Sequence, residues 1–155
     1  MKLFTLAAAS LAMAIAAPAF AQNVEKVGPA GGRILTAAKV KAGATTVYLS
    51  GNLASPATPG GSDYGDTKTQ TISTLKKIKE LLAAHGMTMK DIVRMDAYLV
   101  AAPGMDGKMD FAGFNAGFAE FFNNAENPTT TTRTTMQISA LAGPQFLVEL
   151  TVIAA

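Results

Sequence analysis

Five short segments of the chain have the apolar content and spacing of β-strands, namely residues 34–41, 45–50, 91–100, 134–141 and 146–153. Segment 91–100 alternates most clearly. One of its faces is apolar, and the other carries Arg94, Asp96 and Tyr98. This alternation is typical of a strand that buries one face. Arg94 and Asp96 are therefore expected to form an ion pair on the polar face.

Two further segments have apolar residues at helical spacing. The first contains Ile72, Leu75, Ile78 and Leu82, and it runs from a capping-box signature at Thr67 and Gln70 to a stop at Gly86. The second follows Asp110, a capping residue, and its phenylalanines lie on one face. Asn115 shares that face. Its amide is expected either to make a buried structural hydrogen bond or to brace a functional site.

The predicted order is strand–strand–helix–strand–helix–strand–strand, which indicates an α+β sheet with two helices packed on one face. Residues 34–155 are expected to form a single domain, preceded by a flexible leader at 22–33. The loop at 54–66 either rims a pocket or connects two elements. Because the second face of the sheet lacks a covering layer in this order, we expect a homo-oligomer.

Residues 1–21 have the features of a cleaved export signal. Lys2 precedes an apolar segment, and Ala19-Phe20-Ala21 provides a cleavage site before Gln22. Cleavage would leave no membrane anchor and would place the protein in the periplasm or outside the cell. It would also lower the net charge from +2 to +1. That charge provides no basic surface for nucleic acid or acidic membranes.

The composition excludes several kinds of chemistry. The chain contains no cysteine and a single histidine, His85. Thiol nucleophiles, redox-active cysteine pairs and zinc sites built from cysteine or several histidines are therefore excluded. His85 falls in the last turn of the first predicted helix, where a cation suits the helix dipole.

One carboxylate stands out, because Glu149 interrupts the otherwise apolar run 146–153. Arg133 lies sixteen residues upstream, just before the preceding predicted strand at 134–141. If the two strands lie side by side, the cation and the carboxylate share a cleft that holds a small anionic substrate beside an acid/base group. The alternative is a structural ion pair at a subunit boundary.

Several motifs resemble the Rid (YjgF-type) family of enamine/imine deaminases in their order. They are Val-Tyr-Leu-Ser-Gly-Asn at 47–52, Asp-Ile-Val-Arg-Met-Asp-Ala-Tyr-Leu at 91–99, the aromatic segment 111–122, Arg-Thr-Thr-Met-Gln-Ile at 133–138, and Leu-Val-Glu-Leu-Thr-Val-Ile-Ala at 147–154. The resemblance extends over about residues 34–155. It implies a chorismate-mutase-like fold, a homotrimer with active sites in clefts between subunits, and no metal or organic cofactor.

The resemblance also implies an activity, which is hydrolysis of small carboxylate-bearing 2-enamines and 2-imines to 2-oxo acids and ammonia. Arg133 would hold the substrate carboxylate and Glu149 would position or activate water. Further residues implied to bind substrate are Ser50, Gly51, Asn52, Asn115 and Thr135.

One departure from the family pattern supports a different function. The tyrosine that family deaminases carry before the first strand is replaced here by Leu35 or Thr36. The alternative function is therefore that of a non-catalytic protein of the same fold, which binds small metabolites or other proteins.

Overall fold

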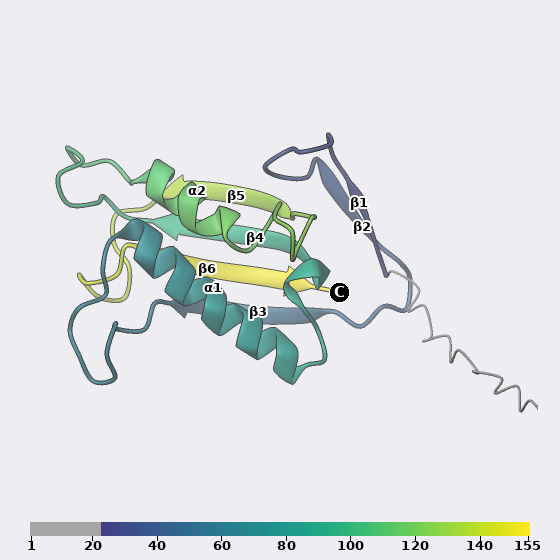
Figure 1. The fold of residues 1–155 in the computed structure, drawn as a ribbon, viewed down its shortest axis with the longest axis horizontal. Coiled ribbons are helices and arrows are strands. Elements are labelled where there is room, and N and C mark those ends of the chain that lie inside the picture. The colour runs from purple at the N-terminus through teal and green to yellow at the C-terminus, as the bar shows by residue number, and fades with distance from the viewer. Residues whose placement is uncertain (1–22) are drawn as a thin grey trace, which may run out of the picture.

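The computed structural model describes residues 23–155 (Figure 1). The predicted export signal at 1–21 lies outside the described residues. The main body is a four-stranded sheet formed by β3 (Val47–Leu53), β4 (Ile92–Leu99), β5 (Thr132–Gln137) and β6 (Val148–Ala154). Helices α1 (Thr67–Ala84) and α2 (Phe111–Ala119) cover one face of this sheet (Figure 1). The predicted α+β architecture with two helices on one face is therefore confirmed.

The strand order is β3-β6-β4-β5, so the last strand of the chain lies inside the sheet and β5 forms an edge. Strands β4 and β5 run parallel, and α2 lies in the connection between them. Strand β6 runs antiparallel to both β3 and β4. Consequently β5 and β6, although consecutive in sequence, are separated by β4.

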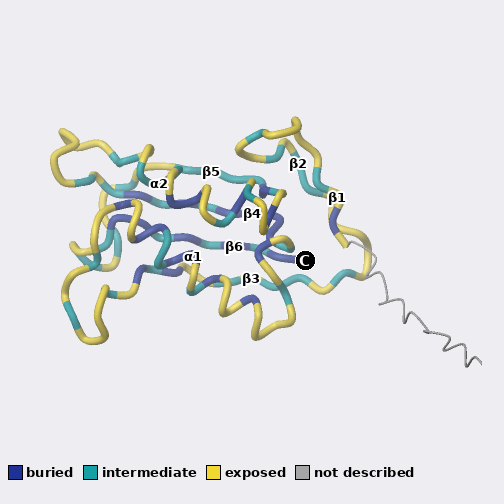
Figure 2. The backbone as a smooth tube through the Cα atoms, in the orientation of Figure 1, coloured by how far each residue is buried: buried dark blue, intermediate teal, exposed yellow. Residues whose placement is uncertain are grey.

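A single large apolar core lies between the helices and the sheet (Figure 2). Its largest fully buried side chains come from both helices and from the central strands, and they include Leu75, Ile78, Leu82, Met95, Leu99, Phe114, Phe118, Phe122 and Leu150. Burial of each such side chain contributes about 1.5–3 kcal/mol to folding. The alternation in β4 and β6 thus fixes which side chains point toward the helices and which point away.

The start of α1 differs from the predicted capping box. Asp66 is the N-cap, and its carboxylate accepts a hydrogen bond from the backbone N–H of Thr69 at 2.8 Å. Gln70 instead ties the helix to the segment before β6. It donates to the carbonyl of Gln145 at 2.9 Å and accepts from the N–H of Leu147 at 2.8 Å. Its amide therefore satisfies backbone groups in the core, where a capping interaction was expected.

Part of the predicted flexible leader at 22–33 is a strand. Strand β1 (Val24–Val27) pairs antiparallel with β2 (Ala37–Val40), and the two form a separate hairpin. The hairpin is held to the main sheet by a small apolar cluster in which Val24 packs with Val93 and Ala155. In Figure 1 its turn lies near the end of the sheet where β5 begins. Ordered pairing and packing replace the flexibility expected there.

Candidate anion site and the position of Glu149

Arg133 lies on the helix-covered face of edge strand β5. Its Cζ atom is 4.4 Å from the ring centroid of Phe118 and 4.9 Å from that of Phe114. Its Nη2 donates a hydrogen bond to Oδ1 of Asn115 at 2.8 Å. These three partners come from consecutive turns of α2, because residues three and four apart lie on one helix face. Asn115 therefore braces Arg133, as one of the two interpretations of the sequence proposed.

The guanidinium of Arg133 has an incomplete set of partners. Within residues 23–155, its Nη1 and the hydroxyl of Thr135 are buried and have no hydrogen-bond partner. No Asp or Glu in this part of the chain forms a salt bridge with Arg133. A buried donor without an acceptor costs about 1–3 kcal/mol. The arrangement therefore favours an anionic ligand or a group supplied by a second subunit.

Burial, and secondly repulsion from Arg33, lowers the pKa of Arg133 to about 10. Arg133 consequently remains positively charged at neutral pH. Because the two phenylalanine faces and the helix exclude water on one side, an anion that reaches this arginine meets a weakly screened charge. A guanidinium in such surroundings has the donors and the charge to bind a small anion such as a carboxylate.

Glu149 lies on the opposite face of the sheet. Its neighbours Val148 and Leu150 are fully buried in the core beneath the helices, so alternation directs Glu149 to the other side. Its carboxylate lies against Gly51, at a point where the pairing of β3 with β6 shifts in register. A Cβ atom at Gly51 would collide with Oε1 of Glu149. The bulge and the missing side chain together leave room for the carboxylate.

Within one chain, Arg133 and Glu149 therefore lie on strands that are not neighbours, so the condition under which the sequence placed them in one cleft is not met. On β4, Arg133 pairs with Met95 and Glu149 pairs with Tyr98. The two residues are thus about two strand spacings apart across the sheet, roughly 10 Å, and they point to opposite faces. A small ligand cannot contact both side chains of one chain. If they act on the same molecule, they come from different subunits.

Some of the remaining predicted site residues lie near Arg133, and the others lie near Glu149. Thr135 lies on the face of Arg133, two residues along β5. Ser50 and Gly51 are exposed at the bulge beside Glu149. Asn52 is buried, and its Nδ2 donates to the carbonyl of Ser50 at 2.7 Å. The position of Asn52 indicates that it stabilises the bulge, whereas the sequence suggested direct substrate binding.

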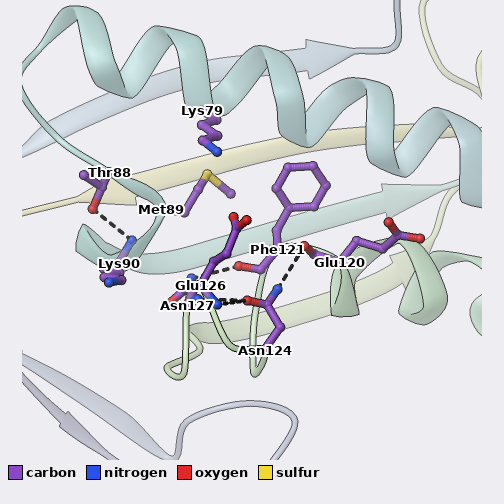
Figure 3. Close-up of a pocket in the computed structure, with 9 residues that line it drawn as sticks. All are labelled: Lys79, Thr88, Met89, Lys90, Glu120, Phe121, Asn124, Glu126 and Asn127. Carbon is purple, nitrogen blue, oxygen red and sulfur yellow. Dashed lines mark hydrogen bonds between the residues drawn. The ribbon is translucent and has the colours of Figure 1, made fainter.

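Two shallow pockets occur elsewhere on the described chain. Figure 3 shows the first, which lies beside the ends of α1 and α2 and is lined by Lys79, Thr88, Met89, Lys90, Glu120, Phe121, Asn124, Glu126 and Asn127. None of the predicted site residues lines it. Within residues 23–155, no group of three or more His, Cys, Asp or Glu side chains is arranged to hold a metal ion. No helix in the same range is long and apolar enough to cross a membrane.

Three residues that act on Arg133 were not predicted from the sequence to do so. Phe114 and Phe118 were assigned to the core alone, although they also stack on Arg133. Arg33 was placed in a flexible leader. The signal that identifies its position is the pair of short strand-like segments around the Gly-Pro-Ala-Gly-Gly turn at 28–32, which together form a hairpin.

The fold and its sites place the chain among α+β proteins with two helices on one face of a mixed sheet. The family model described as endoribonuclease L-PSP matches residues 36–155. The chain therefore belongs to this family, which is also known as the YjgF, Rid or RutC family. The resemblance inferred from the motifs is confirmed at the level of the family.

Individual relatives agree with this assignment. A RutC family protein of Sulfurisphaera tokodaii is 33% identical over 110 residues, which cover 70% of this chain and 78% of the relative. A RutC family protein of Pyrococcus horikoshii is 30% identical over 87 residues, which cover 56% of this chain and 64% of the relative. The matched region thus spans just under two thirds of the Pyrococcus protein.

Solved structures show the same fold. The Rid family protein YyfB of Yersinia pestis superposes with a TM-score of 0.68 at 23% identity, covering 86% of this chain and 98% of YyfB. The structure of Escherichia coli TdcF with bound serine gives a TM-score of 0.58 at 26% identity, covering 75% of this chain and 84% of TdcF. Proteins of this family are typically homo-oligomers, and trimers are typical among them.

Proposed function

We propose that this protein hydrolyses small 2-imino and 2-enamino acids to 2-oxo acids and ammonia, at sites shared between two subunits. The observation that carries the proposal is the half-buried, charged Arg133. It packs over two phenylalanine rings with Asn115 as its brace, and no carboxylate among residues 23–155 pairs with it. Family membership supports the reaction class, because imine and enamine deamination is associated with the family.

In the proposed reaction, the guanidinium of Arg133 holds the substrate carboxylate by paired hydrogen bonds. Glu149 of the neighbouring subunit accepts a proton from water as the water oxygen bonds to the carbon of the C=N group. The resulting tetrahedral adduct carries both a hydroxyl and an amino group. The substrate reacts as the protonated imine, which an enamine reaches by tautomerisation. Glu149 returns its proton to the amino nitrogen, and it then takes the hydroxyl proton as the C–N bond breaks and the C=O bond forms. Transfer of that proton to the released ammonia leaves an ammonium ion, a 2-oxo acid and ionised Glu149. Atoms and charge balance without a cofactor.

A shared site is consistent with the surface of the sheet. The face that carries Glu149 has no helices, and Tyr48 on edge strand β3 is 74% exposed there. Arg94 and Asp96 form their predicted ion pair on the same face, with 2.6 Å between Nη2 and Oδ1. Association of a neighbouring subunit with this face would bring its own Arg133 toward Glu149. The serine bound to TdcF is itself a small molecule with a 2-amino acid carboxylate, which supports the same ligand class.

The test is ammonia release when purified protein is added to an amino-acid oxidase that generates imino acids. The wild type is expected to accelerate release, while Arg133→Ala and Glu149→Gln are expected to abolish the acceleration. Lys39→Gln and Glu126→Gln remove charges at exposed positions outside both places and serve as matched controls. Unchanged release by Arg133→Ala would refute the proposal. Tight binding of 2-oxo acids without turnover would favour the non-catalytic binding protein.

We also propose that residues 1–21 direct export and are removed, so that the reaction takes place in the periplasm or outside the cell. Sequencing the N-terminus of protein recovered from intact bacteria tests this proposal. A mature chain that begins at Gln22 is expected, and an intact Met1 in the cytoplasmic fraction would overturn it.

A further inference from the structure

The turn of the N-terminal hairpin is held against the segment that leads into β5. Leu35 donates its backbone N–H to the carbonyl of Thr131 at 3.0 Å, and the Thr130 hydroxyl donates to the carbonyl of Arg33 at 2.9 Å. Lys26 adds a bond from Nζ to the carbonyl of Thr130 at 2.8 Å. Thr130 precedes Arg133 by three residues. These bonds join two segments about a hundred residues apart and hold the backbone of Arg33 against the segment that leads to Arg133.

Arg33 and Arg133 are close enough that the charge of Arg33 contributes to lowering the pKa of Arg133. Arg33 is exposed, and no Asp or Glu among residues 23–155 forms a salt bridge with either arginine. The hairpin's other basic residues are differently placed. Lys26 experiences the charge of Asp91, and Lys39 pairs with Glu25 at 2.9 Å. The like charges of Arg33 and Arg133 repel each other, and an anion that lies near both would relieve this repulsion.

We propose that Arg33 binds a second carboxylate of the substrate, so that the preferred substrates are short 2-iminodicarboxylic acids such as those formed from aspartate or glutamate. This inference rests on the proposed function, because it assigns Arg133 to the first carboxylate. Arg133 is braced by Asn115 and by two aromatic rings, whereas Arg33 is exposed in the connection between β1 and β2. Arg133 thus binds the carboxylate that all 2-imino acids share, and Arg33 selects substrates whose side chain carries a second carboxylate.

The experiment compares imines made from acidic amino acids with imines made from neutral amino acids, each generated by a matching oxidase. Arg33→Gln is expected to lower kcat/KM for the dicarboxylic imine by about fivefold, the strength of a partly exposed ion pair. Its kcat/KM for the monocarboxylic imine is expected to stay within about twofold of wild type. Lys39→Gln removes a charge from the same hairpin and is expected to change neither value.

Binding by calorimetry separates this inference from the proposed reaction. 2-Oxoglutarate is expected to bind the wild type more tightly than 2-oxobutyrate does, and Arg33→Gln is expected to remove that difference. If no imine is turned over but this binding preference and its loss are observed, the proposed reaction fails and the second carboxylate subsite stands. If imines are turned over but Arg33→Gln affects both classes equally, the subsite is refuted and the reaction stands.

Discussion

The opposite placement of Arg133 and Glu149 makes a quantitative prediction about mixed oligomers. Arg133→Ala and Glu149→Gln subunits are each expected to be inactive alone. Co-expressed, they are expected to recover activity, because an intact Arg133 from one subunit then meets an intact Glu149 from another. The reason is geometric, since the two side chains of one chain lie on opposite faces of the sheet and two strands apart.

The size of the recovery follows from ring symmetry. In a cyclic trimer that contains both kinds of subunit, one of the three interfaces joins an intact Arg133 to an intact Glu149 in the required direction. Recovery should therefore reach about one third of the wild-type rate per trimer. If each chain carried a complete site of its own, the same mixed trimers would be inactive.

The assay requires two affinity tags, one on each variant, and purification over both so that only mixed oligomers remain. Ammonia release from an oxidase-generated imine is then measured beside the wild type and the two pure variants. Size-exclusion chromatography verifies that the mixed species is assembled. An assembled mixed oligomer without activity, beside an active wild type, would refute the shared site.

Three further predictions concern single positions. Gly51→Ala places a Cβ against Oε1 of Glu149 and so displaces its carboxylate. In steady-state kinetics, kcat for imine hydrolysis should fall by about tenfold to a hundredfold while KM changes little. Phe118→Leu removes a ring from the Arg133 guanidinium, and calorimetry should show 2-oxo acid binding weakened by about 0.5–2 kcal/mol in protein that remains folded. Burial lowers the pKa of Lys26 from 10.5 to about 8, so between these two pH values Lys26 is protonated in the unfolded chain and neutral in the folded one. The free energy of unfolding should therefore rise with pH over this range, and thermal unfolding should show a smaller rise in Lys26→Met. An equal rise in both proteins would contradict the prediction.

Much of the fold was predictable because the local signals and the tertiary structure agree. From Met95 onward, burial confirms the alternation of strand β4, with Met95, Ala97 and Leu99 in the core, whereas Val93 packs in the separate cluster with Val24 and Ala155. Asp110 caps α2 as predicted, and its carboxylate accepts from the N–H of Gly113 at 2.8 Å. Gly86 ends the first helix with a φ of +72°, a conformation that favours glycine. In each case the structure depends on residues close together in the sequence, so the local pattern is enough to predict it.

The features that were missed depend on contacts between distant segments. Strand β1 has only 4 residues and a weak pattern, and its stability comes from pairing with β2 and packing against Val93. Gln70 has the spacing of a capping residue, but its amide is drawn to Gln145 and Leu147, about 75 residues away in sequence. Local preference amounts to a few tenths of a kcal/mol to about 1 kcal/mol. Hydrogen bonds to buried backbone groups contribute more free energy of folding than a helix cap does, so Gln70 bonds to the distant segment.

The relation between Arg133 and Glu149 illustrates the same limit at the candidate site. Their separation of sixteen residues suggested neighbouring strands, but the parallel pairing of β4 with β5 places β4 between them. An ion pair within the chain would have explained both residues without any ligand. Its absence from the described residues leaves Arg133 as a half-buried cation whose buried Nη1 has no hydrogen-bond partner. Because such a group destabilises the isolated chain, its presence is explained best by an anion, from a substrate or a partner subunit, that binds it in the assembled protein.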